Sequence, residues 1–163
     1  MTLLNVNLAQ NEELVAEPTE IAYRQVAPHM LIDEEKVAST AFGPLPADQG
    51  MPSFSRSSVV TAQESRDWFS VNSGKISHAV YGVTVEEVIA AGTVVVDDSA
   101  CELAADEIRS PGHCFVNYRE LSRPERKTVR AKLYMSAMDR KEIPTRPLQW
   151  QEEETLLDLI EET

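Results

Sequence analysis

The sequence has none of the features that would place a chain in a membrane or in a secretory pathway. It contains no apolar run that approaches the roughly 20 residues a helix needs to cross a bilayer. Its first residues, MTLLNVNLAQNEELVAEP, have no basic start, and Asn5, Asn7 and Gln10 interrupt the apolar positions, unlike a secretory signal. We therefore expect a cytoplasmic protein with no membrane contact.

Soft metal ligands are few and do not have metal-binding spacings. No C-x-x-C, H-x-x-x-H or zinc-finger pair occurs among the two cysteines and three histidines, which are Cys101, Cys114, His29, His78 and His113. His113 and Cys114 are adjacent, so on a strand they point to opposite faces and cannot bind one ion without a local bend. We expect no metal and no disulfide, with both thiols free in a reducing compartment.

Motifs that fix a reaction are also missing. The chain has no G-x-S-x-G elbow, no G-x-G-x-x-G fingerprint and no phosphate loop, so hydrolysis and nucleotide binding by those routes have no sequence support. Cys114 has no basic neighbour in sequence to lower its pKa, and as a strand residue we expect it to be buried. No catalytic set is favoured.

The negative charge is concentrated at the two ends of the chain. Residues 1–20 hold four glutamates, residues 151–163 hold six acidic side chains, and neither stretch has a lysine or arginine. These stretches account for most of the net charge of −12. Acidic ends argue against direct binding of nucleic acid, because phosphates would repel them. Such blocks are typical of segments that bind a protein partner, and a basic partner would complement them.

Three capping boxes predict where helices begin. In each, a hydroxyl residue is followed three positions later by a glutamate, so the two side chains can bond each other's backbone amides. The pairs are Thr61 with Glu64, Thr84 with Glu87, and Ser122 with Glu125. They predict helices over about 62–70, 85–91 and 123–140.

Runs of β-favouring residues predict strands between these helices. We expect strands within 21–28, 76–84, 93–98 and 113–121, and two short ones around 38–42 and 53–56 in the loop region 33–58, which is rich in Gly, Pro and Ser. The fold class is α+β: a mixed, mainly antiparallel sheet with two or three helices. The predicted division is an acidic arm (1–20), one domain (21–143) and an acidic amphipathic helical tail (144–163).

The tail and the last helix differ in charge. Trp150, Leu156, Leu157 and Ile160 form a narrow apolar stripe on the otherwise acidic tail, and we predict that this stripe binds a protein partner. From Arg119 to Lys141, eight basic residues outnumber three acidic ones. That basic stretch is either a solvated helix face or a surface for an acidic segment, which could come from this tail, from the tail of another copy, or from a partner.

Arg24 is unusual because a guanidinium on an apolar strand is costly to bury without an anionic partner. An arginine on one strand, a Ser-x-Ser strand and a later glutamate resemble the pattern by which one class of ADP-ribosyltransferases holds NAD. Arg24, Ser53, Ser55 and one of three glutamates could fill those places, with His113 as a further candidate; the glutamates are Glu86, Glu87 and Glu120.

A longer resemblance covers residues 22–118. The order Arg24-Gln25-Val26-Ala27-Pro28, Phe42-Gly43-Pro44, Ser53-Phe54-Ser55 and Gly112-His113 is similar to that of a group of small bacterial proteins with RQV-x-P, F-x-P and LSV-type elements. The resemblance implies a bacterial origin and no particular activity. Phe54, Arg56 and the acidic tail depart from the group's pattern. Within the resemblance, the polar residues of first interest are Arg24, Asp48, Ser55 and His113.

Two functions follow from the sequence. The favoured one is a non-enzymatic bacterial interaction protein, such as an accessory, immunity or antitoxin-like subunit, whose acidic tails bind a protein partner or another copy. The alternative is a small NAD-binding enzyme built around Arg24 and Ser55. The first predicts no cofactor and the second predicts NAD.

Overall fold

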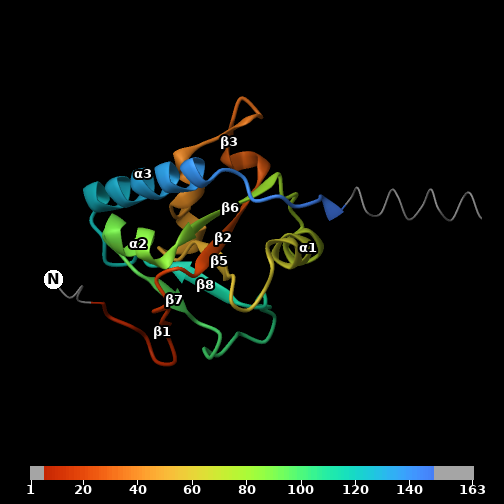
Figure 1. The fold of residues 1–163 in the computed structure, drawn as a ribbon. Helices are drawn as coiled ribbons and strands as arrows, with labels where there is room; N and C mark the ends of the chain where they lie inside the picture. Colours follow the sequence, from red (N-terminus) through yellow and green to blue (C-terminus); the bar gives the residue numbers. More distant parts are fainter. Residues whose placement is uncertain (1–5, 149–163) are drawn as a thin grey trace, which may run out of the picture.

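The structure, a computed structural model, describes residues 6–148. A six-stranded sheet has the order β1-β7-β8-β5-β2-β6, every neighbouring pair is antiparallel, and β3 and β4 form a separate hairpin (Figure 1). The strands are β1 (Glu13–Leu14), β2 (Ile21–Val26), β3 (Leu31–Ile32), β4 (Lys36–Val37), β5 (Ser53–Arg56), β6 (Ala79–Thr84), β7 (Val95–Asp97) and β8 (His113–Val116). The described helices are α1 (Ala62–Asn72), α2 (Val85–Ala91) and α3 (Arg123–Arg140), with short 3-10 helices η1 (Pro28–Met30), η2 (Ser39–Phe42) and η3 (Pro46–Asp48). The predicted α+β class is confirmed.

All three predicted helices begin at their capping boxes. The Thr61 hydroxyl accepts a hydrogen bond from the Glu64 amide at 3.1 Å, and the Glu64 carboxylate accepts one from the Thr61 amide at 3.0 Å. The pairs at the starts of α2 and α3 make the same reciprocal bonds. Each box satisfies amides that have no partner inside the helix, so a four-residue pattern fixes the start of each helix. In the part of the chain that the structure describes, no helix is both long and apolar enough to cross a membrane.

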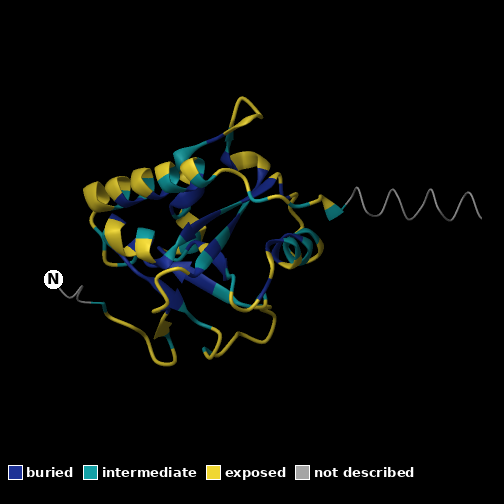
Figure 2. Cartoon of the chain, viewed as in Figure 1, coloured by how far each residue is buried: buried dark blue, intermediate teal, exposed yellow. Residues whose placement is uncertain are grey.

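One face of the sheet carries the main core. Val26, Phe54 and Cys114 pack there with Phe42 of η2 and Leu133 of α3. The buried residues lie in the layer between the sheet and the two helices α2 and α3 (Figure 2). This face therefore supplies most of the apolar burial that stabilises the fold.

The other face of the sheet is covered only in part. α1 contacts β2, and a small cluster of Val94, Val96 and Phe115 is covered by Val6 and Met51. Between α1 and the loop that follows β7, side chains of the sheet remain accessible. This partly open face holds the cleft described below.

The stretch 38–42 was predicted as a strand, and that prediction is wrong. Ser39–Phe42 forms η2, and the neighbouring Ala41 and Phe42 are both fully buried. A strand would send these two side chains to opposite faces, whereas a tight turn turns both toward the core. The Tyr118 hydroxyl donates to the Phe42 carbonyl at 2.7 Å and helps hold the turn in place.

Both predicted domain boundaries move outward. Residues 13–14 are the edge strand of the main sheet and Val15 is buried, so this part of the predicted arm belongs to the body. At the other end, the Ile143 amide donates to the Val80 carbonyl, and the Thr145 hydroxyl accepts a bond from Arg66. The predicted tail begins at residue 144, but this stretch is bonded to the body through residue 146.

Candidate functional site

A cleft of about 490 Å³ opens on the partly covered face of the sheet. Its volume lies within the range of about 300–1,000 Å³ that is usual for small-molecule sites. Three walls surround it, formed by the strands β2, β5 and β8, by α1, and by the loop 98–112. The polar and aromatic lining residues used below are Gln25, Ser53, Ser55, Ser65, Trp68, Phe69, Asp98, Arg109 and His113.

Ser53, His113 and Asp98 form a hydrogen-bonded chain in this cleft. The Nε2 atom of His113 lies 2.9 Å from the Ser53 Oγ, and its Nδ1 lies 2.7 Å from the Asp98 Oδ1. Ser53 is exposed, while the His113 and Asp98 side chains are 18% and 19% exposed. The imidazole therefore bridges a hydroxyl that faces solvent and a largely enclosed carboxylate. This arrangement of nucleophile, base and orienting carboxylate is that of a serine catalytic triad, which is recognised by geometry and not by sequence order.

The strand register brings these residues together. β5 pairs with β8 so that His113 lies opposite Ser55, and Ser53 is two residues away on the same face. β7 pairs with the other side of β8, with Asp97 opposite Cys114. Asp98 follows directly, so its carboxylate reaches the face that His113 occupies.

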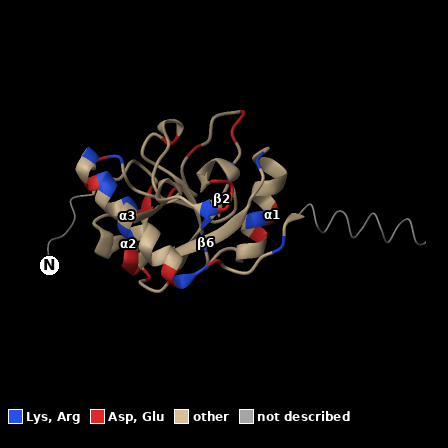
Figure 3. Ribbon diagram, turned by 90° about the horizontal axis from the view of Figure 1, so that it is seen from above, with Lys and Arg blue, Asp and Glu red and all other residues tan. Residues whose placement is uncertain are grey.

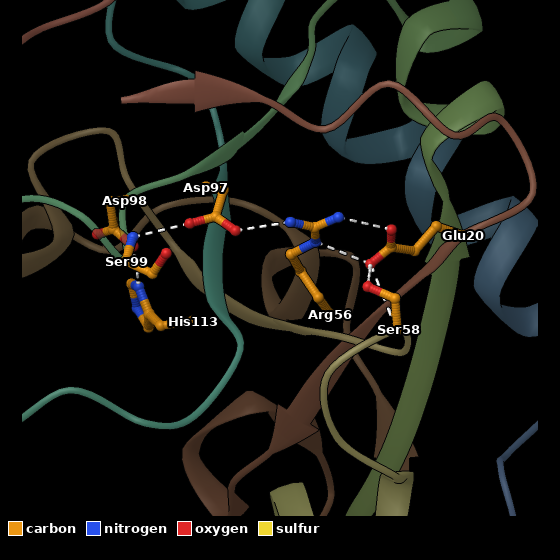
Figure 4. Close-up of polar contacts among 7 residues, drawn as sticks. All are labelled: Glu20, Arg56, Ser58, Asp97, Asp98, Ser99 and His113. Carbon is orange, nitrogen blue, oxygen red and sulfur yellow. Dashed lines mark hydrogen bonds and ion pairs between the residues drawn. The ribbon is translucent and has the colours of Figure 1, made fainter. Parts of the chain in front are cut away.

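The adjacent residues Asp97 and Asp98 belong to two different hydrogen-bonded groups. The Arg56 Nη1 donates to Asp97 at 2.7 Å, and both Arg56 and Ser58 donate to the buried Glu20 (Figure 4). The other Asp97 oxygen accepts the Ser99 amide at 2.7 Å. This bond fixes the turn that carries Asp98. The Glu20–Arg56–Asp97 cluster therefore positions the Asp98 carboxylate against His113.

The Glu20–Arg56–Asp97 cluster is expected to make the fold sensitive to acid. The hydrogen bond from Arg56 lowers the pKa of Glu20 below its usual 4.5 despite opposing burial. Burial also opposes the shift at Asp97, but bonds from Ser99 and Arg56 lower its pKa. Because the unfolded carboxyls take up protons at higher pH than the folded ones, this stabilisation is complete above the unfolded pKa values and is lost as the pH falls through the folded ones.

We expect a Glu20→Gln variant to be less stable than wild type at neutral pH and to lose less of its remaining stability on acidification. Urea unfolding at a series of pH values from neutral to about 3 measures both effects. Glu13→Gln is the matched control, since Glu13 is exposed and makes no ion pair within residues 6–148. A Glu20→Gln acid profile parallel to that of wild type would contradict this role of the cluster.

Ser55 belongs to a different hydrogen-bond network. The Ser65 hydroxyl donates to the Ser55 Oγ at 3.0 Å, Gln25 donates to Ser65 at 2.9 Å, and Ser77 donates to Gln25 at 2.7 Å. Ser55 is only 7% exposed. Its hydroxyl lines the cleft but makes no bond to His113, so Ser55 serves as an internal comparison for Ser53.

Arg24 lies on the opposite face of the sheet from Ser55. Its guanidinium donates to the carbonyls of Ala41 at 2.7 Å and Ser53 at 2.8 Å, and it lies 5.4 Å from the centroid of the Phe54 ring. Burial lowers the pKa of Arg24, and the Asp48 charge opposes that shift. Arg24 therefore ties η2 to the start of β5 and does not converge with Ser55 on one ligand.

The three candidate glutamates are also apart from the cleft lining. Glu86 and Glu87 lie in the first turn of α2, where Glu87 pairs with Arg140 at 2.7 Å. Glu120 lines a separate hollow beside Thr93 and Asn117. The structure does not assemble Arg24, Ser55 and a glutamate into the NAD site that the sequence suggested.

The remaining described candidates from the sequence do not take part in the hydrogen-bonded chain of Ser53, His113 and Asp98. Cys114 is fully buried on the core face, and burial raises the pKa of its thiol, which removes it as a nucleophile at neutral pH. Asp48 accepts the Leu45 amide at 2.7 Å. Within residues 6–148, no group of three or more His, Cys, Asp or Glu side chains is placed to hold a metal ion. The predicted partner-binding residues lie outside the described residues; they are Trp150, Leu156, Leu157 and Ile160.

Asp98 is the site residue that sequence reasoning missed. Ser53 and His113 were both candidates, but nothing in the sequence linked them to an aspartate 45 and 15 residues away. The available signal was the Asp97-Asp98 pair at the end of a predicted strand, because alternation places one carboxylate on each face.

Comparisons with protein-family models, curated proteins and solved structures found no match.

Proposed function

We propose that the protein is a small serine hydrolase or acyltransferase whose reaction takes place in the cleft. The observation that carries this proposal is the continuous chain from the Ser53 hydroxyl through His113 to Asp98. A serine hydroxyl is a weak nucleophile unless a base removes its proton, and His113 is within hydrogen-bonding distance of it. Asp98 holds the imidazole with Nδ1 protonated, which leaves Nε2 free to accept the proton.

The reaction follows from these positions. The Ser53 Oγ attacks the acyl carbon of an ester or amide while His113 Nε2 takes the hydroxyl proton. His113 then gives that proton to the leaving alcohol or amine, and an acyl group remains on Ser53. Water, deprotonated by His113, attacks the acyl carbon. The bond between the acyl carbon and the Ser53 Oγ then breaks, and His113 returns the proton to the Ser53 Oγ. The products are a carboxylic acid and the leaving alcohol or amine.

The walls of the cleft suggest how a substrate would be held. Trp68 and Phe69 of α1 offer apolar surface to an acyl or aryl group. Arg109 lines the loop wall, and it donates through Nη1 to the carbonyls of Ser99 and Cys101. The other guanidinium nitrogens of Arg109 are the donors that we propose for a negatively charged oxygen of the substrate or intermediate.

Covalent labelling of Ser53 tests the proposal. A fluorophosphonate probe should form a phosphonyl-serine adduct with release of fluoride, and intact-mass spectrometry with peptide mapping should place the adduct on Ser53. Ser53→Ala should abolish labelling. Ser55→Ala, the same change two residues away on the same strand face, should leave it largely intact. A chain that stays unlabelled, or that is labelled equally in Ser53→Ala, contradicts the proposal.

We also propose that the protein is an interaction protein, which is supported by the ion pairs that glutamates of the predicted acidic arm make with the body. Two glutamates of the predicted acidic arm are engaged within the body: Glu12 pairs with Arg119 at 2.8 Å, and Glu20 pairs with Arg56 at 2.8 Å. Binding of a partner through acidic residues would then depend mainly on residues 151–163, which hold six acidic side chains and no base. This role does not conflict with a hydrolytic cleft on the body.

A further inference from the structure

A basic groove lies on the body at the N-terminal end of α3. It has a volume of about 680 Å³ and is lined by Pro44, Arg123, Pro124, Arg126, Lys127 and Arg130. Four of these six residues are basic and none is acidic. Several positions coloured as Lys or Arg lie on the ribbon toward this end of α3 (Figure 3). We call this surface the α3 groove.

Only some of the cations of the α3 groove interact with other residues of the body. Arg126 donates to the Leu121 carbonyl at 3.2 Å, and the stem of Arg130 packs so closely on Gly43 that a Cβ there would lie 2.7 Å from its Cδ. Arg123 and Lys127 are exposed and make no hydrogen bond or ion pair within residues 6–148. Their heads therefore remain available to an anionic ligand.

Arg123 is the first residue of α3, a position that is electrostatically unfavourable for a cation. The first turn of a helix carries a partial positive charge, so cations placed there repel it and anions placed there are attracted. Glu125 is the acidic residue in the first turn, and its carboxylate is engaged with the Ser122 amide at 2.9 Å. An anionic occupant would offset both the helix charge and the repulsion among the cations.

The chain itself contains a complementary occupant. Residues 151–163 hold six acidic side chains and no base, and the segment also carries Trp150, Leu156, Leu157 and Ile160. The two prolines of the α3 groove offer apolar surface beside the cations. Nucleic acid fits less well, because the acidic residues of the same chain would repel phosphates. The complementary charge favours an acidic polypeptide.

The point at which this segment leaves the body favours a second copy as its source. The described chain ends beside α1, whereas the N-terminal end of α3 lies on the opposite side of the molecule (Figure 1). The residues of the α3 groove belong mainly to that end of α3. The bonds of residues 143–146 to the body fix this exit point. Fifteen fully extended residues span at most about 50 Å, which is the upper limit on the reach of residues 149–163.

We propose that the α3 groove binds the acidic segment 149–163 of a second copy of this chain, and that the protein associates with itself through this contact. Exchange of segments would let each of two copies occupy the other's groove. The contact uses a surface apart from the cleft, so it stands whether or not Ser53 is a nucleophile. It depends on charge, and we expect it to weaken as salt is added.

Sedimentation velocity of the full chain tests the proposal through paired charge reversals. Wild type should associate in a concentration-dependent way at about 0.05 M salt and much less at about 0.5 M. A groove variant, Arg123→Glu with Lys127→Glu, should associate at least about tenfold more weakly than wild type. A tail variant, Glu152→Lys with Glu153→Lys and Glu154→Lys, should be weakened to a similar extent. Mixing the groove variant with the tail variant brings an unchanged segment together with an unchanged groove, so the two variants should associate with each other.

The matched control is Lys132→Glu with Lys75→Glu, which makes the same charge change at exposed positions outside the α3 groove. It should associate as wild type does, and circular dichroism should show every variant folded. Wild type that stays monomeric at low salt overturns the proposal, including the case in which the segment binds its own groove. Association that the groove variant leaves unchanged, or that mixing the groove and tail variants does not restore, also overturns it.

Discussion

The His113→Ala variant is expected to hydrolyse an activated ester at Ser53 about 10²–10⁴-fold more slowly than wild type. The loss arises because His113 Nε2, 2.9 Å from the Ser53 Oγ, is the only base bonded to that hydroxyl within the described residues. Steady-state hydrolysis of an aryl ester measures the effect as kcat/KM. His29→Ala, which removes an exposed histidine outside the cleft, should leave the rate unchanged.

Two further variants test whether Ser53, His113 and Asp98 act together on one reaction step. Asp98→Asn should slow hydrolysis less than His113→Ala, because it keeps the base and the geometry but no longer holds the imidazole in the tautomer with Nδ1 protonated. The double variant Ser53→Ala with His113→Ala should be no slower than the worse single variant, since the two residues act on one step. If His113→Ala keeps the wild-type rate, the hydrogen-bonded chain is structural.

Arg24→Ala is expected to lower the free energy of unfolding by about 3 kcal/mol or more. The substitution leaves the buried carbonyls of Ala41 and Ser53 without their donors and opens a void beside Phe54. Arg24→Met should cost less, about 1–3 kcal/mol, because it fills most of the volume and loses only the hydrogen bonds. Urea unfolding measures both values, and Lys132→Ala on exposed α3 surface should stay within about 0.5 kcal/mol of wild type.

Arg24 also connects the core to the cleft. Its bond to the Ser53 carbonyl fixes the backbone at the start of β5 from the face opposite the hydroxyl. We therefore expect the folded Arg24→Met variant to label more slowly at Ser53, with no change in which residue is labelled. An unchanged unfolding free energy in Arg24→Ala would show that Arg24 does not hold η2 and β5 together.

The sequence predicted the parts of the fold that depend on neighbouring residues. The capping box at Ser122 and Glu125 fixed the start of α3, and the predicted range 123–140 matches the helix. Alternation placed His113 and Cys114 on opposite faces, and the structure has one in the cleft and the other in the core. These outcomes need only local hydrogen bonds and the period of a strand.

The same local rules failed where packing decided the conformation. The stretch 38–42 looked like a strand, but burying both Ala41 and Phe42 against the core required a 3-10 turn. The glutamates at the start of the chain were predicted to lie in an acidic arm outside the domain. Glu12 and Glu20 instead found arginines that are distant in sequence, and those partners could not be chosen without the fold.

The sequence by itself determined the α+β class, the helix starts, and the concentration of acidity in residues 151–163, because each depends on residues that are close together in the chain. Tertiary structure alone decided that Ser53, His113 and Asp98 meet, and that Arg24 does not join them. The reason is register: three strands that are far apart in the chain must pair in one order before their side chains share a face.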